Sequence, residues 1–421
     1  MAEHEHQVRA AAAAPLDRSS RIALISAVVV AGFACAVAYH YYLGVCVGLP
    51  YPANTYLFRP HGQFRDFFDL YWLAATPEAY QDRLFLYNYF PFAHLLVDAF
   101  IWLEPWSALL AYLLPLCAAI FGICWIELRE SCRWQTLRNA LILALLSYPI
   151  QFAVDRANNE GLIFLFLYLY VWAVRKERFG YAAVPLALAL AMKPFPAVFL
   201  VLLVISRRFK EAAYGCVAAV GLNLVATNVL HWQLSYNFSY LTEAAEFYSK
   251  FMVVRGRGIP FGHSLWGTVW LFITKFGDNF FPRANAEDLV DAAMKPYFLT
   301  VIGTFLAICW FLRYERVLWK QVALLTFSMN LFPYISSDYK LLHTLIPLFC
   351  FVNAKEREPL DWAYGVLFAL LLIPKNYLTF DLPRLFDANL GILLNPLIMV
   401  VFTMAIIGSG LSRRAASPAA A

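Results

Sequence analysis

The sequence predicts an all-α integral membrane protein, a polytopic helical bundle of about twelve transmembrane helices, on three observations. The 421 residues are 62% hydrophobic and only 14% charged, whereas soluble domains are about 45–50% apolar and about 25% charged. Apolar runs long enough to cross a bilayer core, about 17–25 residues, recur along the whole chain. Between the runs, Lys and Arg gather in short clusters, as they do at the cytoplasmic ends of spans.

We predict one membrane domain over residues 22–412, because no stretch between the apolar runs is long enough for an ordinary soluble domain. Residues 1–21 are Ala-rich and polar, and we expect a disordered cytoplasmic tail there, with a second cytoplasmic tail at 413–421. The run 22–46 is too long for a signal-peptide core, so we expect it to remain as the first span.

The basic clusters set the predicted topology. If all seven lie on the cytoplasmic side, each neighbouring pair encloses a hairpin of two spans, which gives six hairpins and both termini inside. We expect the cations of these clusters to lack partners. The clusters are Arg9/Arg18/Arg21, Arg129/Arg133/Arg138, Arg175/Lys176/Arg178, Arg207/Arg208/Lys210, Arg313/Arg316/Lys320, Lys355/Arg357 and Arg413/Arg414.

Two outer connections are long, the first over residues 48–105 and the fourth over 231–296. Within the first, the apolar piece from Phe90 to Leu103 is too short and too polar to span, so we predict an interfacial helix. The amphipathic piece Leu265–Ile273 predicts a second interfacial helix in the fourth connection.

Polar residues of interest gather on the predicted outer side. Ionisable groups at membrane depth mark functional sites by default, because each costs free energy unless it is paired or hydrated. Lys193 and His343 lie in or against apolar runs, although a snorkelling lysine and a satisfied core histidine are the simpler alternatives. Asp338 and Lys340 also fit an exposed loop pair.

Asp66 lies in the aromatic stretch from Phe64 to Ala75, close to Asp69 on one helix face. A carboxylate held among aromatic rings just outside the bilayer is suited to act as a general base, because partial desolvation raises its proton affinity. The alternative is a solvated loop aspartate.

Several other chemistries lack their motifs. The chain has no Gly-rich phosphate loop, HExxH, GxSxG or zinc-ligand spacing, and no basic run suited to nucleic acid. It also has no soluble nucleotide-binding domain, so a sugar donor would be lipid-linked and would arrive from the membrane.

Six outer motifs, taken in order, resemble glycosyltransferase family 87, polyprenyl-phosphomannose-dependent mannosyltransferases of the GT-C fold superclass. They are the DF-x-x-x-Y-x-x-A pattern from Asp66 to Ala74, YNYFPFAHLL around Tyr89, DRANNEGLIFLFL from Asp155, AMKPFPAVFLVLLVISRR from Ala191, FGHSLWG from Phe261 and SSDYKLLHTLIPL from Ser336. The chain departs from the family pattern at Phe90, where a proline is usual, and at His263, where an Asn is common.

The resemblance implies inverting transfer of a hexose, mannose, from a polyprenyl phosphate to a hydroxyl of a glycolipid or glycan, on the extracytoplasmic side of the bacterial inner membrane. It makes Asp66 the catalytic base and Lys193, Lys340, His343 and Arg156 the donor-phosphate ligands. The expected substrate-binding residues are Arg65, Tyr71, Tyr89, Asn159, Glu160, His263 and Asp338. We expect a monomer in contact with membrane lipids, no bound metal, no cofactor and no nucleic-acid partner.

Two other interpretations stay open on the sequence. A secondary transporter or flippase of lipid-linked glycans would place polar residues near the bilayer midplane and in symmetric pairs of broken helices. A lipid-glycan ligase or polymerase would carry paired arginines in a large outer loop, of which Arg255 and Arg257 are a weak match.

Overall fold

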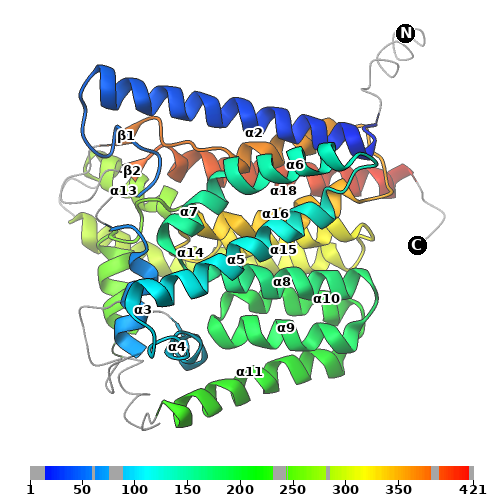
Figure 1. Ribbon diagram of the computed structural model, residues 1–421, viewed down its shortest axis with the longest axis horizontal. Helices are drawn as coiled ribbons and strands as arrows, with labels where there is room; N and C mark the ends of the chain where they lie inside the picture. Colours follow the sequence, from blue (N-terminus) through cyan, green and yellow to red (C-terminus); the bar gives the residue numbers. More distant parts are fainter. Residues whose placement is uncertain are drawn as a thin grey trace.

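The computed structural model describes residues 15–58, 62–74, 89–230, 243, 245–280, 285–380 and 388–416. Its helices lie side by side along the long axis of the molecule, with α2 (Arg18–Tyr41) at one edge and α11 (Phe209–Val229) at the opposite edge (Figure 1). The only strands in the described part are β1 (Thr379–Phe380) and β2 (Ala388–Asn389), a two-residue antiparallel pair. The predicted all-α class is therefore confirmed.

Five helices of the described chain are long and apolar enough to cross a membrane, and a bent pair makes a possible sixth span. The five are α2 continued by η1 (Tyr42–Cys46), α5 (Pro105–Glu127), α11, α14 (Ala286–Leu312) and α18 (Gly391–Ala416). The pair is α6 (Arg133–Leu146) and α7 (Tyr148–Arg156), bent by 54°. The protein is thus a helical membrane protein.

The predicted count of about twelve spans stays a prediction, because the other apolar helices are short. They are α8 (Glu160–Arg175), α9 (Phe179–Met192), η3 (Phe195–Phe199), α10 (Leu200–Ile205), α15 (Leu318–Leu331), α16 (Leu345–Val352) and α17 (Asp361–Leu372). The polar 3-10 helix η5 (Asp338–Thr344) precedes α16.

Capping residues move two predicted boundaries. The Asp17 side chain accepts a hydrogen bond of 2.8 Å from the backbone N–H of Ser20, so α2 begins at Arg18, inside the predicted tail. Asn285 likewise caps α14, which begins inside the connection predicted to run to residue 296. Pro296 therefore lies within a helix and does not mark its start.

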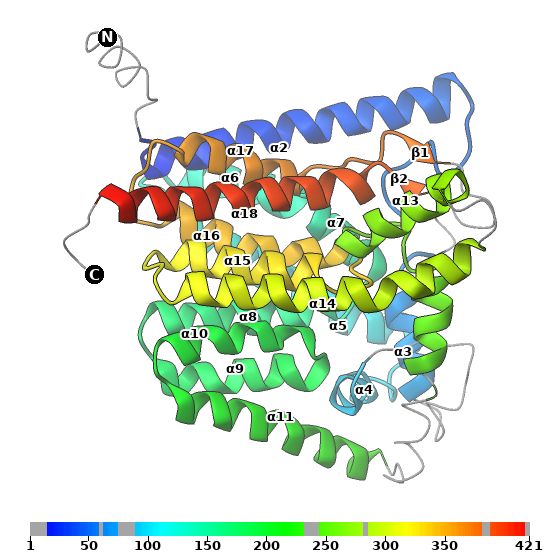
Figure 2. The same ribbon diagram turned by 180° about the vertical axis from the view of Figure 1, so that it is seen from behind.

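Short helices gather at one end of the bundle (Figure 2). They are α3 (Arg65–Ala74), α4 (Pro91–Asp98), η4 (Ser249–Val254) and α13 (Leu265–Phe280). α4 falls within the predicted interfacial piece and ends before Leu103, and α13 starts where predicted but continues beyond Ile273. We call this the Asp66 end. A location at the membrane surface stays a prediction for these helices.

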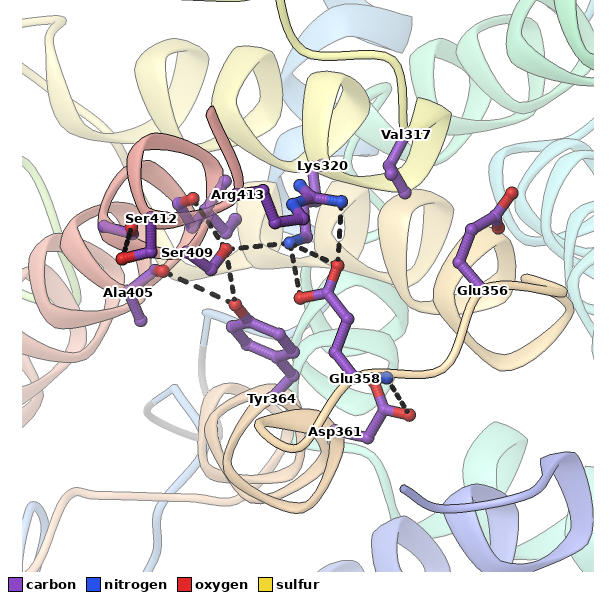
Figure 3. Close-up of polar contacts among 12 residues, drawn as sticks. Val317, Lys320, Glu356, Glu358, Asp361, Tyr364, Ala405, Ser409, Ser412 and Arg413 are labelled. Carbon is purple, nitrogen blue, oxygen red and sulfur yellow. Dashed lines mark hydrogen bonds and ion pairs between the residues drawn. The ribbon is translucent and has the colours of Figure 1, made fainter. Parts of the chain in front are cut away.

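The opposite end, where α2 begins and α18 finishes, is held by ion pairs, and we call it the basic end. Figure 3 shows Glu358 between Lys320, at 2.6 Å, and Arg413, at 3.1 Å. Arg21, almost fully buried, pairs with Asp361 at 2.7 Å. The expectation that these cations lack partners is therefore wrong, because acidic residues of neighbouring connections reach them. The pairs tie the first and last helices to the connection between α16 and α17.

Candidate active site

A tight turn between α7 and α8 brings the Arg156 and Asn158 side chains to the same carboxylate, that of Asp66. α7 ends at Arg156, and the next residue, Ala157, adopts the left-handed conformation with φ of 47°, which reverses the chain. Asn158 and Asn159 follow before α8 begins at Glu160. Arg156 occupies the last turn of α7, where a cation is favoured by the helix dipole.

The Asp66 carboxylate is held by this turn. It lies in the first turn of α3, where the helix dipole favours negative charge. One of its oxygens accepts from the Arg156 guanidinium, and the other accepts from Asn158 Nδ2 at 2.6 Å. Each carboxylate oxygen has two lone pairs, so each keeps one lone pair that can accept a proton from a substrate hydroxyl. The Tyr89 hydroxyl bonds Asn158 Oδ1 at 2.9 Å and fixes the amide orientation.

Asp66 faces a polar cavity of about 350 Å³. Among the described residues, five charged side chains line it: Arg65, Asp66, Asp69, Arg156 and Arg257. Aromatic rings and small residues complete the wall, among them Phe58, Tyr89, Phe152, Tyr248, Phe261 and Tyr339. A sugar fits such a site, because rings cover its apolar faces while charged groups bond its hydroxyls.

A second polar group lies behind the aromatic wall. Glu160 accepts from Lys193 Nζ at 2.7 Å and contacts His343 Nε2 at 2.9 Å, and all three side chains are buried. Lys193 has extended backbone between α9 and η3, as expected for a residue that precedes a proline. Its ammonium lies 4.1 Å from the centroid of the Tyr89 ring. None of the three is among the residues that line the cavity, and the phosphate role of Lys193 and His343 stays a prediction.

His263 and Asp338 form a buried network below the cavity. Their side chains lie 3.1 Å apart, His263 Nε2 contacts Ser336 Oγ at 3.0 Å, and Asp338 accepts from the Tyr148 hydroxyl at 2.7 Å. Burial lowers the pKa of His263, so a neutral ring that joins two partners is favoured. The network fixes residues 261–263 against 336–338, and Phe261, Ser337 and Tyr339 at the cavity wall belong to these segments or adjoin them.

Of the remaining predicted residues, Arg65 lines the cavity, whereas Lys340 and Tyr71 do not. Arg65 lines the cavity and pairs with Asp69 at 3.2 Å. Lys340 is buried, with Nζ 3.9 Å from the Phe195 ring centroid and 3.4 Å from the carbonyl of Ile335. Tyr71 lies outside the cavity lining, because its hydroxyl bonds the Leu103 carbonyl at 2.8 Å.

Asn159 also points away from Asp66. Its Oδ1 accepts from the Tyr112 hydroxyl at 3.1 Å, inside the bundle. Asn159 was predicted to bind substrate, but it is Asn158, the first residue of the Asn-Asn pair, that bonds the Asp66 carboxylate. Arg257 was also left out of the predicted site, although its position in a loop with two arginines was a usable signal.

An apolar groove of about 620 Å³ adjoins the polar cavity, and the two share Tyr248 and Ile335. Its walls come from η3, η4, α14 and α15 and the residues that follow α15. Phe298, Ile302 and Leu306 of α14 line the groove and are exposed on the bundle surface. The groove therefore opens on the side of a helix long and apolar enough to face lipid.

The described residues contain no group of three or more His, Cys, Asp or Glu side chains arranged to hold a metal ion. Metal independence stays a prediction.

In a comparison with protein families, the chain matches the model of glycosyltransferase family 87 over residues 85–333. The matched stretch covers more than half of the chain and includes Arg156, Asn158, Glu160, Lys193 and Arg257, whereas Asp66 precedes it. No curated protein and no solved structure matches the chain. The predicted family is confirmed: the chain belongs to glycosyltransferase family 87 and is a membrane glycosyltransferase.

Proposed function

We propose that the protein transfers a hexose, mannose, from a polyprenyl-phosphate sugar to a hydroxyl of a glycolipid or glycan at the extracytoplasmic face, with inversion. The observation that carries the proposal is the adjacency of the two spaces. The polar cavity that holds Asp66 shares Tyr248 and Ile335 with an apolar groove open on α14. A donor with a sugar head and a hydrocarbon tail fits this pair of spaces, whereas a nucleotide sugar has no hydrocarbon chain to occupy the groove.

Asp66 is the general base in this proposal. The acceptor hydroxyl oxygen attacks the anomeric carbon and gives its proton to Asp66, while the bond from that carbon to the phosphate oxygen breaks. The electron pair of that bond leaves with the polyprenyl phosphate, which needs no proton at that stage. A single displacement of this kind inverts the anomeric configuration.

Asn158 and Arg156 position the base. The Asn158 amide and the Arg156 guanidinium each bond one carboxylate oxygen, so the carboxylate cannot rotate freely. Preorganised donors of this kind add to the rate because they need no rearrangement during the reaction.

The test uses the purified protein in lipid nanodiscs with radiolabelled polyprenyl-phosphomannose and a panel of glycolipid acceptors. Asp66→Asn should lower the transfer rate by about 10²–10⁴-fold, the usual contribution of a general base. The matched control is Asp69→Asn, since Asp69 lines the same cavity from the same helix but is paired with the half-exposed Arg65. It should retain transfer to within about tenfold.

Near wild-type transfer by Asp66→Asn would contradict the assigned base. Polyprenyl phosphates of other hexoses, and a nucleotide-linked mannose, serve as donor controls. Faster transfer from any of them would overturn the assignment of the donor.

A further inference from the structure

The charges around the polar cavity do not balance. In the described part of the chain, its lining holds three arginines and two aspartates. Arg156 pairs with Asp66, and Arg65 pairs with Asp69 at 3.2 Å. Among the residues that the structure describes, Arg257 has no carboxylate partner. One positive charge at the cavity is therefore available to a ligand.

The backbone around Arg257 is fixed. Gly256 has φ of +72° and lies so close to Trp270 that an added Cβ would stand 2.3 Å from the indole ring. The Trp270 Nε1–H donates to the Val254 carbonyl at 2.9 Å. At Gly258, whose N–H donates to the Met252 carbonyl at 3.1 Å, a Cβ would meet Ile335 at 2.8 Å. Two glycines thus let the loop pack tightly on both sides of the arginine.

The Arg257 side chain is held as well, although it stays exposed. Its guanidinium carbon lies 4.1 Å from the centroid of the Phe251 ring on η4. An exposed guanidinium stacked on an aromatic ring keeps its hydrogen-bond donors available, because the ring covers only one face of the fork. The arginine is therefore oriented without being neutralised.

Arg257 lies where the polar cavity meets the apolar groove. Gly258 lines the cavity and packs on Ile335, which lines both spaces, and η4 contributes Met252 to the cavity and Val253 to the groove. In a lipid-linked sugar the phosphate is the junction between the polar head and the hydrocarbon tail. A donor placed across the two spaces brings its phosphate to this boundary.

We propose that Arg257 binds the phosphate of the lipid-linked donor, an inference that rests on the proposed function. A phosphodiester carries one negative charge, which matches the single positive charge of Arg257. When the bond to the anomeric carbon breaks, the phosphate gains a second negative charge, and a guanidinium held beside it stabilises that charge. Arg257 joins Lys193, Lys340 and His343, which the sequence predicted for this role, whereas the fourth predicted residue, Arg156, is held by Asp66.

The test separates the phosphate from the lipid tail. Binding of farnesyl phosphate, farnesol and inorganic phosphate is measured by competition with radiolabelled farnesyl phosphate on the protein in nanodiscs. Arg257→Ala should weaken farnesyl phosphate binding by about 10–100-fold, the effect of losing a charge-assisted hydrogen bond, and should leave farnesol binding unchanged. Arg257→Lys should recover part of the loss. Inorganic phosphate should compete weakly, because it lacks the tail.

Arg255→Ala is the matched control. Arg255 belongs to the same loop, is exposed, does not line the cavity and lies 3.8 Å from Glu287. It should bind farnesyl phosphate as the wild type does. Equal loss in both variants would mean a general surface-charge effect, and unchanged binding in Arg257→Ala would overturn the inference.

Failure of the inference and failure of the proposed function give different results. Mannose transfer by the wild type, with an unchanged donor KM in Arg257→Ala, would remove Arg257 from the site and leave the proposed function in place. Arg257-dependent binding of farnesyl phosphate without any transfer from polyprenyl-phosphomannose would keep the phosphate site and overturn the proposed donor.

Discussion

Arg156 and Asp66 form an ion pair across 90 positions of the chain. Arg156 also bonds the Gly62 carbonyl at 2.8 Å and lies 4.2 Å from the centroid of the Phe58 ring. One arginine at the end of α7 therefore fastens both the carboxylate and the chain segment that leads to it. The position of Asp66 depends on this side chain as much as on α3 itself.

Replacing Arg156 should lower the transfer rate, by less in Arg156→Lys than in Arg156→Ala. Arg156→Lys keeps the charge but loses the planar fork that reaches Asp66 and Gly62 together, so transfer should fall about 10-fold, and Arg156→Ala should fall about 100-fold or more. The measurement is the transfer rate with polyprenyl-phosphomannose. Arg175→Lys, in the Arg175–Glu127 pair at the basic end, is the control and should transfer normally. Equal rates for Arg156→Ala and the wild type would contradict the positioning role.

The Glu160 cluster should behave as a unit. Glu160→Gln leaves Lys193 as a buried cation without its partner, and the free energy of unfolding should fall by about 3–5 kcal/mol. Glu160→Gln combined with Lys193→Met removes both charges and should be more stable than Glu160→Gln alone. Thermal unfolding in detergent compares the variants. Additive losses in the double variant would show that the two residues are not coupled.

Lys340 should make the free energy of unfolding depend on pH. Burial lowers the pKa of its ammonium from the ordinary 10.5 to about 7, so the folded protein releases this proton near neutral pH while the unfolded chain keeps it. The free energy of unfolding should therefore rise as the pH increases from about 7 towards 10.5. Lys340→Met should show a smaller rise, because burial also lowers the pKa of Lys375 to about 7 and that group still contributes. Thermal unfolding at several pH values measures it.

The Lys340 amine should also make donor binding depend on proton uptake. If Lys340 contacts the donor phosphate, binding at pH 8 recharges the amine and takes up a proton, which calorimetry in buffers of different ionisation enthalpy detects. Lys340→Arg stays charged and should bind without proton uptake. No uptake by the wild type would remove Lys340 from the phosphate site.

The predicted orientation can be tested with two native cysteines. Cys46 is exposed where η1 ends, and Cys132 is exposed between α5 and α6, next to the basic end. Backbone N–H groups of Gln135 and Trp134 lower the pKa of the Cys132 thiol, which favours its reaction with maleimide. In variants that keep only one of the two, Cys46 should react in intact cells and Cys132 only after permeabilisation. The reverse pattern would invert the topology.

The fold class followed from the sequence because lipid imposes strong constraints on composition and span length. The helix boundaries were predicted less accurately than the fold class. Asp17 and Asn285 are ordinary capping residues, yet only the structure shows which of several candidates begins each helix. The predicted connection 231–296 ends too late, since α14 begins at Ala286 and carries Pro296 in its interior.

The sequence predicted many residues of the site, but it did not predict which of them form ion pairs or hydrogen bonds with one another. Lys193 and His343 were selected because charge at membrane depth is costly, and Asp66, Arg156 and Glu160 because the motifs resemble a family, but the partner of each lies on a distant segment and depends on packing. Asn158 was missed for a local reason: the left-handed Ala157 decides which amide of the Asn-Asn pair turns towards Asp66. Spacing alone does not reveal that rotation.

Tyr248 and Ile335 separate the polar cavity from the apolar groove while belonging to both. On the proposed function, the groove gives the spent polyprenyl phosphate a sideways exit into the bilayer, apart from the polar cavity in which the acceptor hydroxyl meets Asp66. Neither product then has to wait for the other to depart. Turnover would show no obligatory order of product release, and a long-chain acceptor could stay in place while the carrier lipid is exchanged for a fresh donor.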